Sequence, residues 1–447
     1  MIGFRMSAVQ TIPPVPRDSA LDRPLRIALV HTADQGGGAE ASTLSLHLAL
    51  KRLGHESQLY VGTKLTTHPD VFEIPRFRSF PGVLRGAQWL ERQFGWQYLY
   101  HPWFRQLDRL FRGEIDVIHF HSLWAGRMGY ADVGGLPRLT RCYPSIMTLR
   151  DLWMVTGHCA CPAIGCELWK TGCGRCPDLR LQPAVEVDGT AFNWQRKRRA
   201  IGASNLRITT VSNWLRDVVR SSPIFQGKEV HTVYNGIDES AYFPRSRTTI
   251  REKLGLPQQA FIVMLAGQSV EGTSASGEGA ARFALEALSN CHPEPYALIV
   301  GKSSVSVLQR WGKAGRAVEF QTDPAKLAEY YCAADVVLVA SLWETFGRIP
   351  AEAQMCGVPV VGFATGGIPE IVEEGVTGLL VPSQDGTRLA SALTTMATNP
   401  ELRHRMGLAG AERAQRMFGN GLVAENYVRH YRSVIASRQV AKRMVKK

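Results

Sequence analysis

Residues 335–372 read DVVLVASLWETFGRIPAEAQMCGVPVVGFATGGIPEIV, which predicts a strand, a helix and a second strand in close succession. The apolar run DVVLVA ends at polar residues, as a buried parallel strand does. Pro350 suits the first position of a helix, and Gly357 suits its end. The next apolar run, VPVVGFA, predicts the following strand. The stretch is therefore expected to form one unit of a parallel α/β sheet.

The same alternation occurs along most of the chain. RIALVHT at 26–32 predicts a strand, the glycine-rich ADQGGG a loop, the segment that ends at Gly54 a helix, and SQLYVG a second strand. Further apolar runs of this kind occur at 115–122, 143–151, 206–212, 229–238, 260–267, 294–302, 317–322, 335–341 and 358–364. They form two series, so we expect two doubly wound α/β domains in tandem.

A polar, charged stretch separates the two series and predicts a linker. The N-terminus is rich in proline and lacks a continuous apolar segment, so we expect a disordered tail rather than a secretion signal. The predicted parts are a tail at 1–24, a first domain at 25–243, a linker at 244–258, a second domain at 259–416 and a C-terminal helix with a basic tail at 417–447.

The composition is that of a globular protein with a basic balance. The 447 residues carry a net charge of +13, which predicts anionic partners such as nucleotide phosphates or anionic lipid surfaces. Nucleic acid is disfavoured because the chain shows no helix-turn-helix or RNP-type pattern. No run of about 18 apolar residues occurs, so no membrane-spanning helix is expected. The 9 cysteines are too few for a disulfide scaffold, and reduced thiols or a bound metal are expected instead.

Two glutamates, Glu344 and Glu352, flank the start of the predicted helix in the opening stretch. In open parallel sheets, ligands bind at the carboxyl ends of the strands, where Glu344 is expected to lie. A helix N-terminus favours phosphate there, and a carboxylate accepts hydrogen bonds from vicinal sugar hydroxyls. A nucleotide sugar satisfies both demands. The alternative is that Glu352 only complements the helix dipole and Glu344 is a solvated charge.

The stretch 341–372 resembles the C-terminal signature of glycosyltransferase family 4, a family of retaining enzymes with the GT-B fold. The shared pattern is a glutamate, a Phe-Gly pair, a second glutamate after seven intervening residues, CGVPVV and GGIPEIV. GGGAE at 36–40, TTVSNWLRDVV at 209–219 and VYNGID at 233–238 agree with it. The cysteine-bearing stretch 151–177 looks like the branch that includes colanic-acid-type exopolysaccharide transferases.

The resemblance implies two Rossmann-like domains that face each other across a cleft. It implies transfer of a sugar from a nucleotide-sugar donor to a glycan or lipid-linked saccharide in polysaccharide biosynthesis. Glu352 would hold the ribose of the donor, Glu344 would contact the transferred sugar, and N–H groups around Phe346 and Gly347 would face the sugar and the diphosphate. The glycines that would let the first helix approach the same phosphates are Gly36, Gly37 and Gly38.

The chain departs from the family where the diphosphate is held. Most relatives carry an Arg and a Lys-Gly pair at positions where this chain has Gln268 and Glu278. A cation within 4 Å of a phosphate contributes up to about 4 kcal/mol at an effective dielectric of about 20, so the loss matters. Lys302 and Arg348 are candidate replacements, and each could also be an ordinary surface charge. The alternative function is therefore a catalytically altered relative that binds a nucleotide or glycan without efficient transfer.

Two further positions bear on the chemistry. Arg150 stands where many relatives carry a His that reaches the donor sugar, and it could contact a phosphate or an acidic sugar instead. Asp34 and Asp151 are candidate bases for the acceptor hydroxyl, or loop caps. No D-x-D pair occurs, so metal-independent chemistry with no catalytic cofactor is expected. No residue is visibly a glycosyl nucleophile, and retention follows only from the resemblance.

Five cysteines crowd the predicted insertion at 157–178. The C-x-x-C spacing within it is the knuckle that a zinc site favours, and a loop with little core of its own gains from a metal. The predicted ligands of a structural zinc are Cys159, Cys166, Cys173 and Cys176, and His158 or Cys161 could substitute. Two disulfides, or unpaired thiols, remain alternatives. A closed site of four thiolates would leave no open position for catalysis.

The segment 76–112 combines many arginines with crowded aromatic residues. These are Trp89, Phe94, Trp96, Tyr98, Tyr100, Trp103 and Phe104. We interpret the segment as a helical lip at an anionic membrane surface, where a lipid-linked acceptor would enter. The alternative is an insertion whose aromatic side chains pack on the first domain. A cytoplasmic protein, peripheral at the inner face of the cell membrane, is expected.

Overall fold

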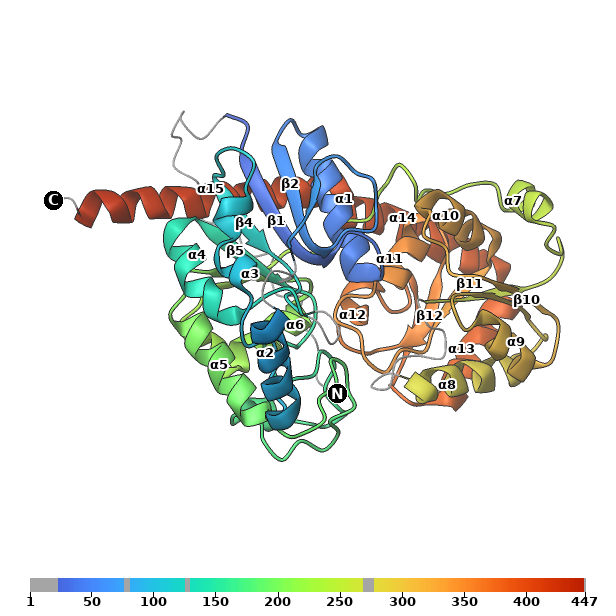
Figure 1. Ribbon diagram of the computed structural model, residues 1–447. Helices are drawn as coiled ribbons and strands as arrows, with labels where there is room; N and C mark the ends of the chain where they lie inside the picture. Colours follow the sequence, from blue (N-terminus) through green and yellow to red (C-terminus); the bar gives the residue numbers. More distant parts are fainter. Residues whose placement is uncertain (1–22, 76–80, 125–128, 268–276, 446–447) are drawn as a thin grey trace.

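The computed structural model describes residues 23–75, 81–124, 129–267 and 277–445 (Figure 1). Two α/β units stand side by side, each built on one parallel sheet. Alternate residues of one strand enter different apolar clusters: Ala28 and Val30 pack into one, Ile27 and Leu29 into another. Both faces of the sheet are thus covered, which explains the continuous apolar runs in the sequence. The prediction of two doubly wound domains is confirmed.

The first domain holds a seven-stranded sheet in the order β3-β2-β1-β4-β5-β6-β7. Its strands are β1 (Arg26–Ala33), β2 (Glu56–Thr63), β3 (Val71–Glu73), β4 (Val117–Phe120), β5 (Ser145–Leu149), β6 (Arg207–Thr210) and β7 (Val230–Thr232). Its α-helices are α1 (Gly38–Arg52), α2 (Pro81–Phe94), α3 (Pro102–Arg105), α4 (Leu136–Cys142), α5 (Thr190–Gly202) and α6 (Asn213–Ser221). Short 3-10 helices are η2 (Leu107–Leu110), η3 (Val133–Gly135), η4 (Leu168–Lys170) and η5 (Pro223–Phe225).

The second domain holds a six-stranded sheet in the order β10-β9-β8-β11-β12-β13. Its strands are β8 (Ile262–Ala266), β9 (Tyr296–Val300), β10 (Gly315–Val318), β11 (Val336–Val339), β12 (Val360–Phe363) and β13 (Gly378–Val381). Its helices are α7 (Arg247–Leu254), α8 (Gly277–Ser289), α9 (Ser304–Trp311), α10 (Pro324–Ala333), α11 (Arg348–Met355), α12 (Ile368–Ile371), α13 (Gly386–Thr398) and α14 (Pro400–Phe418).

The structure differs from the sequence analysis at three edges. The strands β3 (VFE) and β13 (GLLV) were not predicted, because no longer apolar run surrounds these short segments. The edge strand β10 begins and ends before the predicted 317–322. The predicted linker contains helix α7, whose Arg251 forms a buried ion pair with Asp335 at 2.7 Å, so this segment packs on the second domain.

The last helix, α15 (Asn420–Val445), returns to the first domain and lies along it (Figure 1). Its Val423, Tyr427 and Tyr431 are buried in the apolar cluster that also holds β1 residues. The Tyr431 hydroxyl lies 2.7 Å from Nδ1 of His119 in β4. The chain therefore crosses between the domains twice, and α15 belongs to the first domain by its packing. Among the described residues, no helix is both long and apolar enough to cross a membrane.

A carboxylate joins the two domains directly. Glu370 of α12 accepts hydrogen bonds from the backbone N–H groups of Asn213 and Trp214, at 2.8 and 2.7 Å, and from the Tyr234 hydroxyl at 3.1 Å. Asn213 and Trp214 begin helix α6, so Glu370 caps a helix of the other domain. This contact fixes how the carboxyl ends of the two sheets meet.

Candidate active site

The loop after β11 carries Glu344 and is shaped by two glycines further along the chain. The N–H of Gly367 donates to the carbonyl oxygen of Glu344 at 3.0 Å. Gly366 has φ +57°, and a Cβ there would lie 1.8 Å from the same oxygen. Only glycine fits such a contact, which explains why the Gly-Gly pair follows the glutamate motif.

The Glu344 side chain folds back on its own loop. The backbone N–H groups of Phe346 and Gly347 hydrogen-bond to its carboxylate. Burial raises the pKa of Glu344, and these N–H groups oppose that shift. The N–H groups predicted to face the sugar and diphosphate therefore engage a carboxylate in this structure. The Phe346 ring is buried in the core, 5.6 Å from the Phe418 ring, and Gly347 is the left-handed N-cap of α11.

Glu352 is the fifth residue of α11, and only 4% of its surface is exposed. One carboxylate oxygen lies 2.7 Å from Nε of Arg348, and the other accepts a hydrogen bond from the Tyr331 hydroxyl at 2.9 Å. Burial raises the pKa of Glu352, and Arg348 opposes that shift. The carboxylate predicted to hold ribose is thus already held by the protein, although four lone-pair positions leave room for further donors.

Arg348 reaches across to the first domain. Its Nη1 donates to Oγ of Ser42 in α1 at 3.0 Å, and its Cδ lies 3.4 Å from where a Cβ at Gly38 would be. Gly37 is the N-cap of α1, and its N–H donates to Glu40 at 2.8 Å. Arg348 therefore lies between the N-termini of α1 and α11, the position predicted for the diphosphate. Gly36 and Gly38 are exposed at this end of α1.

Arg150, directly after β5, is a buried cation without a counter-charge. It is 8% exposed, and no Asp or Glu oxygen of the described chain lies within 4.0 Å of its guanidinium. Its Nη1 donates to Oδ1 of Asn235, its Nη2 lies 3.4 Å from Nδ1 of His121, and its Nε is buried without a partner. Burial lowers the pKa of Arg150, and Arg348 nearby adds to that effect. An uncompensated buried charge is costly, so this site favours an anion.

Three histidines, His31, His119 and His121, underlie Arg150. The rings of His119 and His121 lie 4.0 Å apart and those of His31 and His121 5.8 Å apart, measured between centroids. Burial lowers the pKa of His31 to about 3 and lowers the pKa values of His119 and His121 well below the ordinary value of histidine, and Arg150 adds to each shift. All three rings are therefore neutral near pH 7.

The remaining predicted residues lie in different settings. Asp151 accepts from Nε1 of Trp124 at 2.9 Å and from the Trp153 N–H at 2.8 Å, which holds its loop in place, and burial raises the pKa of Asp151. Asp34 is likewise occupied by two backbone N–H groups, at 2.7 and 3.0 Å. Lys302 is exposed after β9, 5.8 Å from the Phe320 ring. Gln268 and the side chain of Glu278 lie outside the described part of the chain.

The structure gathers the predicted zinc ligands around one small cavity. Cys159, Cys166, Cys173 and Cys176 line it together with His158, and its volume is about 20 Å³. Sγ of Cys173 accepts the Gly157 N–H at 3.1 Å, and Sγ of Cys176 lies 3.5 Å from Nε2 of His158. All nine cysteines are free, so the structure contains neither of the two disulfides considered. No three of these sulfur atoms lie within 4.8 Å of one another.

Sequence reasoning missed the partners that hold the predicted residues. Ser42 and Tyr242 contact Arg348, His121 and Asn235 contact Arg150, and Tyr331 contacts Glu352. Each meets its partner across a large separation in sequence, as Ser42 meets Arg348 306 residues later, so no local pattern signals the contact. Asn235 lies within the VYNGID stretch, which was the one available signal.

The fold and this arrangement of carboxylates, cations and helix N-termini define a GT-B-type glycosyltransferase, and the comparisons agree. The model of Glycosyl transferases group 1 matches residues 274–413, and that of Glycosyltransferase Family 4 matches residues 36–241. The alpha-maltose-1-phosphate synthase of Mycolicibacterium smegmatis is 30% identical over 358 residues, 72% of this chain and 92% of that protein. D-inositol 3-phosphate glycosyltransferase 1 of Catenulispora acidiphila is 27% identical over 337 residues, 72% of this chain and 73% of that protein.

A solved structure of HepE from Anabaena in complex with UDP-glucose has a TM-score of 0.59 and 17% identity, and covers 93% of this chain and 100% of that chain. At this identity the likeness shows the fold. The chain belongs to glycosyltransferase family 4 and is an enzyme of that type.

The buried histidines predict a pH dependence of stability. Unfolded histidine titrates near pH 6.5, whereas His31 in the folded protein stays neutral down to about pH 3. The unfolded chain therefore binds more protons between these values, and the free energy of unfolding falls as pH is lowered through this window, by up to about 1.4 kcal/mol per pH unit for each such histidine. Urea unfolding at a series of pH values from 7 to 5 measures this slope.

His121→Gln is expected to reduce the slope of unfolding free energy against pH by up to about 1.4 kcal/mol per pH unit, which corresponds to one proton. The control His404→Gln, at an exposed position of α14, is expected to leave the slope unchanged. Equal slopes in the wild type and His121→Gln would contradict a neutral buried ring.

Proposed function

We propose that this glycosyltransferase moves a sugar from a nucleotide-sugar donor to a glycan or lipid-linked saccharide, with the donor diphosphate between Arg150 and Arg348. The observation that carries the proposal is the buried Arg150 guanidinium, which lacks a carboxylate partner in the described chain. A protein tolerates such a charge where function requires it, because an incoming anion supplies the missing partner. A diphosphate at the carboxyl ends of parallel strands also meets the N-termini of α1 and α11.

The two arginines would take the role of the cations that this chain lacks. Gln268 and Glu278 stand where most family members carry an Arg and a Lys. Arg348 is able to exchange its contact with Ser42 for a phosphate oxygen while its Nε keeps the ion pair with Glu352. The UDP-glucose complex of HepE, which shares the fold, supports a nucleotide-sugar donor.

In this proposal the protein acts mainly by electrostatics. When the bond between the anomeric carbon and the diphosphate breaks, negative charge collects on the leaving group, and preorganised cations and helix N–H groups stabilise it. Glu352 would accept hydrogen bonds from the ribose hydroxyls on its unused lone pairs, and Glu344 would turn from its loop toward the transferred sugar. Retention of the anomeric configuration and a role in polysaccharide biosynthesis are inferred from the family signature.

A catalytically altered relative is the second candidate function. Two observations favour it: both Glu352 oxygens are engaged by side chains of the protein, and the usual cations are replaced by Gln268 and Glu278. Such a protein would bind a nucleotide or glycan without efficient transfer.

A donor screen tests the proposal and separates the two candidates. Purified protein is offered uridine, guanosine and adenosine diphosphate sugars with a lipid-linked or free saccharide, and nucleoside diphosphate release is measured. We expect release from one donor and a loss of about 100-fold to 1,000-fold in kcat/KM for Arg150→Met, the usual cost of removing one preorganised donor. The free energy of unfolding of ligand-free Arg150→Met should not fall, because the substitution removes an unpaired buried charge.

Glu352→Gln should also lower kcat/KM, whereas Glu412→Gln and Arg388→Met, at exposed positions, serve as matched controls and should retain activity. Binding of a nucleoside diphosphate without release from any donor would establish the altered relative. Full activity of Arg150→Met would remove Arg150 from the donor site.

We also propose that the aromatic segment rests on an anionic membrane surface. Trp89 is 60% exposed, Phe94, Tyr100 and Trp103 are partly exposed, and Tyr98 is buried against Trp153. The segment is therefore divided between packing on the first domain and exposure. Exposed aromatic rings beside arginines suit the interface of an anionic bilayer.

Sedimentation with vesicles tests this membrane contact. The protein should sediment with vesicles that contain anionic lipid, less so at high salt, and Trp89→Ser should weaken the association while Leu408→Ser, equally exposed on α14, should not. Equal sedimentation with neutral and anionic vesicles would contradict the proposal.

The cysteine cluster supports a further proposal, that it holds a structural zinc. Four thiols border one cavity, and Cys173, Gly174 and Arg175 have φ of +57°, +90° and +50°, a tight turn between the two cysteines of the knuckle. Zn–S bonds of about 2.3 Å would draw the sulfur atoms inward from their present spacing. Burial raises the pKa of Cys159 to about 12 and of Cys173 to about 11, so metal binding would release protons.

Zinc content and thermal unfolding test this site. We expect zinc in the purified protein, loss of that zinc in Cys173→Ser, and a lower Tm after chelation, because the metal would cross-link the loop. Cys142→Ser, on an exposed cysteine outside the cluster, is the matched control. Unchanged zinc content in Cys173→Ser would contradict the proposal.

A further inference from the structure

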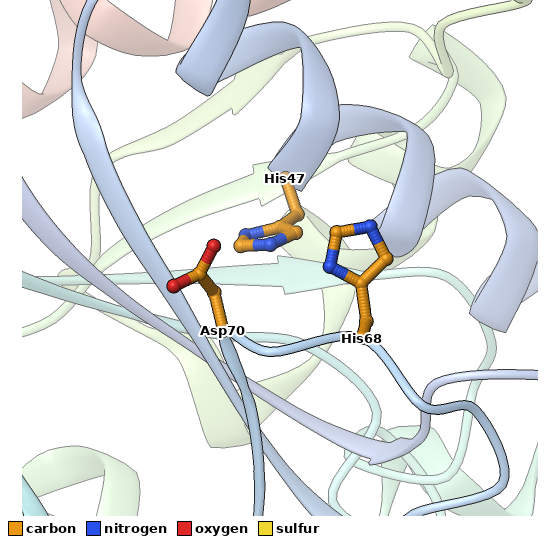
Figure 2. A group of neighbouring side chains, drawn as sticks. All are labelled: His47, His68 and Asp70. Carbon is orange, nitrogen blue, oxygen red and sulfur yellow. The ribbon is translucent and has the colours of Figure 1, made fainter.

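A second group of metal-ligating side chains lies in the first domain, away from the cysteine cluster. His47 comes from α1, and His68 and Asp70 come from the segment between β2 and β3. One ligand atom from each of the three residues lies within 4.8 Å of the others. Figure 2 shows the His68 and Asp70 side chains on either side of the His47 ring. Among the described residues, no other group of three or more His, Cys, Asp or Glu side chains brings its ligand atoms this close together.

Both histidines have a buried ring nitrogen without a partner. His47 is fully buried; its Nδ1 lies 2.8 Å from Oγ of Ser57, and its Nε2 is buried with no hydrogen bond. Nδ1 of His68 is also buried with no hydrogen bond. The two rings meet edge to face with their centroids 5.8 Å apart. A buried nitrogen that lacks a hydrogen-bond partner destabilises the fold, so two of them side by side need an explanation.

The third residue, Asp70, supplies a carboxylate to the same space. One of its oxygens pairs with the Lys51 ammonium, whose side chain is 41% exposed. The second carboxylate oxygen remains for another partner, and an exposed lysine turns into solvent at little cost. When the Nδ1–H of His47 donates to Ser57, the lone pair of this ring lies on Nε2, the nitrogen without a hydrogen bond.

We propose that His47 Nε2, His68 Nδ1 and an Asp70 oxygen bind a divalent transition-metal ion of the Zn²⁺ class. Two imidazoles and one carboxylate suit zinc, with water in the fourth position. The contact between His47 Nδ1 and Ser57 is the second-shell hydrogen bond that orients a metal-bound imidazole. The metal would give both orphaned nitrogens a partner at once.

The ion would have a structural effect on the candidate active site. It would join the second half of α1 to the segment before β3, while the first half of α1 carries Gly38 and Ser42 beside Arg348. Because α1 is one continuous helix, fixing its far end limits how its N-terminus moves at the domain interface. The site itself has no contact with Arg348 or Glu352.

Zn²⁺ titration of the full-length, chelator-stripped protein tests the proposal, with Co²⁺ absorption as a second readout. We expect His68→Gln to lower the Zn²⁺ affinity of the His47 site by at least about tenfold. Removal of a residue that only orients a ligand already costs about tenfold or more in metal affinity. In Co²⁺-loaded His68→Gln, the thiolate charge-transfer band of the proposed cysteine site should remain. The absorption of Co²⁺ bound at the His47 site, which has no thiolate ligand, should be lost. Cys173→Ser should show the opposite pattern.

Lys51→Met gives a control of opposite sign. It removes a competing cation and frees Asp70, so Zn²⁺ should bind this site as tightly as in the wild type or more tightly. Asp70→Asn should weaken binding as His68→Gln does. The proposal would be overturned if His68→Gln kept the Zn²⁺ affinity of the wild type. It would also be overturned if Lys51→Met and His68→Gln lost affinity equally. The cluster would then be an ion pair beside two buried imidazoles.

Discussion

The contact on which the candidate site depends is the capping of α6 in the first domain by Glu370 of the second. The carboxylate accepts two backbone N–H groups and the Tyr234 hydroxyl, so it holds the two domains at one angle. Beside it, the Ser212 hydroxyl donates to the carbonyl oxygen of Thr345 at 2.6 Å, and the Thr345 hydroxyl donates to the Arg150 carbonyl oxygen at 2.7 Å. Helix α15, which follows the second domain in the chain, packs its apolar side chains on the first domain. The carboxyl ends of β5 and β11 meet because of these contacts.

Charge at this meeting point is unbalanced. Arg348 has Glu352 as an ion-pair partner, whereas Arg150 is buried beside neutral histidines and has no carboxylate within ion-pairing distance among the described residues. A buried cation of this kind makes the ligand-free protein less stable than it could be, and it gives an anionic ligand a large electrostatic advantage. Arg150 is also a departure from the family, and we propose that it compensates for the Arg and Lys that this chain replaces with Gln268 and Glu278.

Sequence reasoning was most successful where the chemistry is local. Glu344 and Glu352 are eight positions apart on either side of one helix start, so the order of residues alone places both at the carboxyl end of β11. The four cysteines lie within eighteen residues and border one cavity. Sequence reasoning missed the cluster of His47, His68 and Asp70, because a histidine on a helix and two residues of a loop share no spacing rule.

The sequence by itself determined the two parallel sheets, their order along the chain, the motif of two glutamates and the cysteine loop, because hydrophobic periodicity and short-range turn geometry act between neighbours. Only the tertiary structure decided which side chains complete the site. Arg348 meets Ser42 across 306 residues, and the missing counter-charge of Arg150 is a property of everything packed around it. Burial and electrostatic balance are sums over the whole fold, and no segment of the chain contains them.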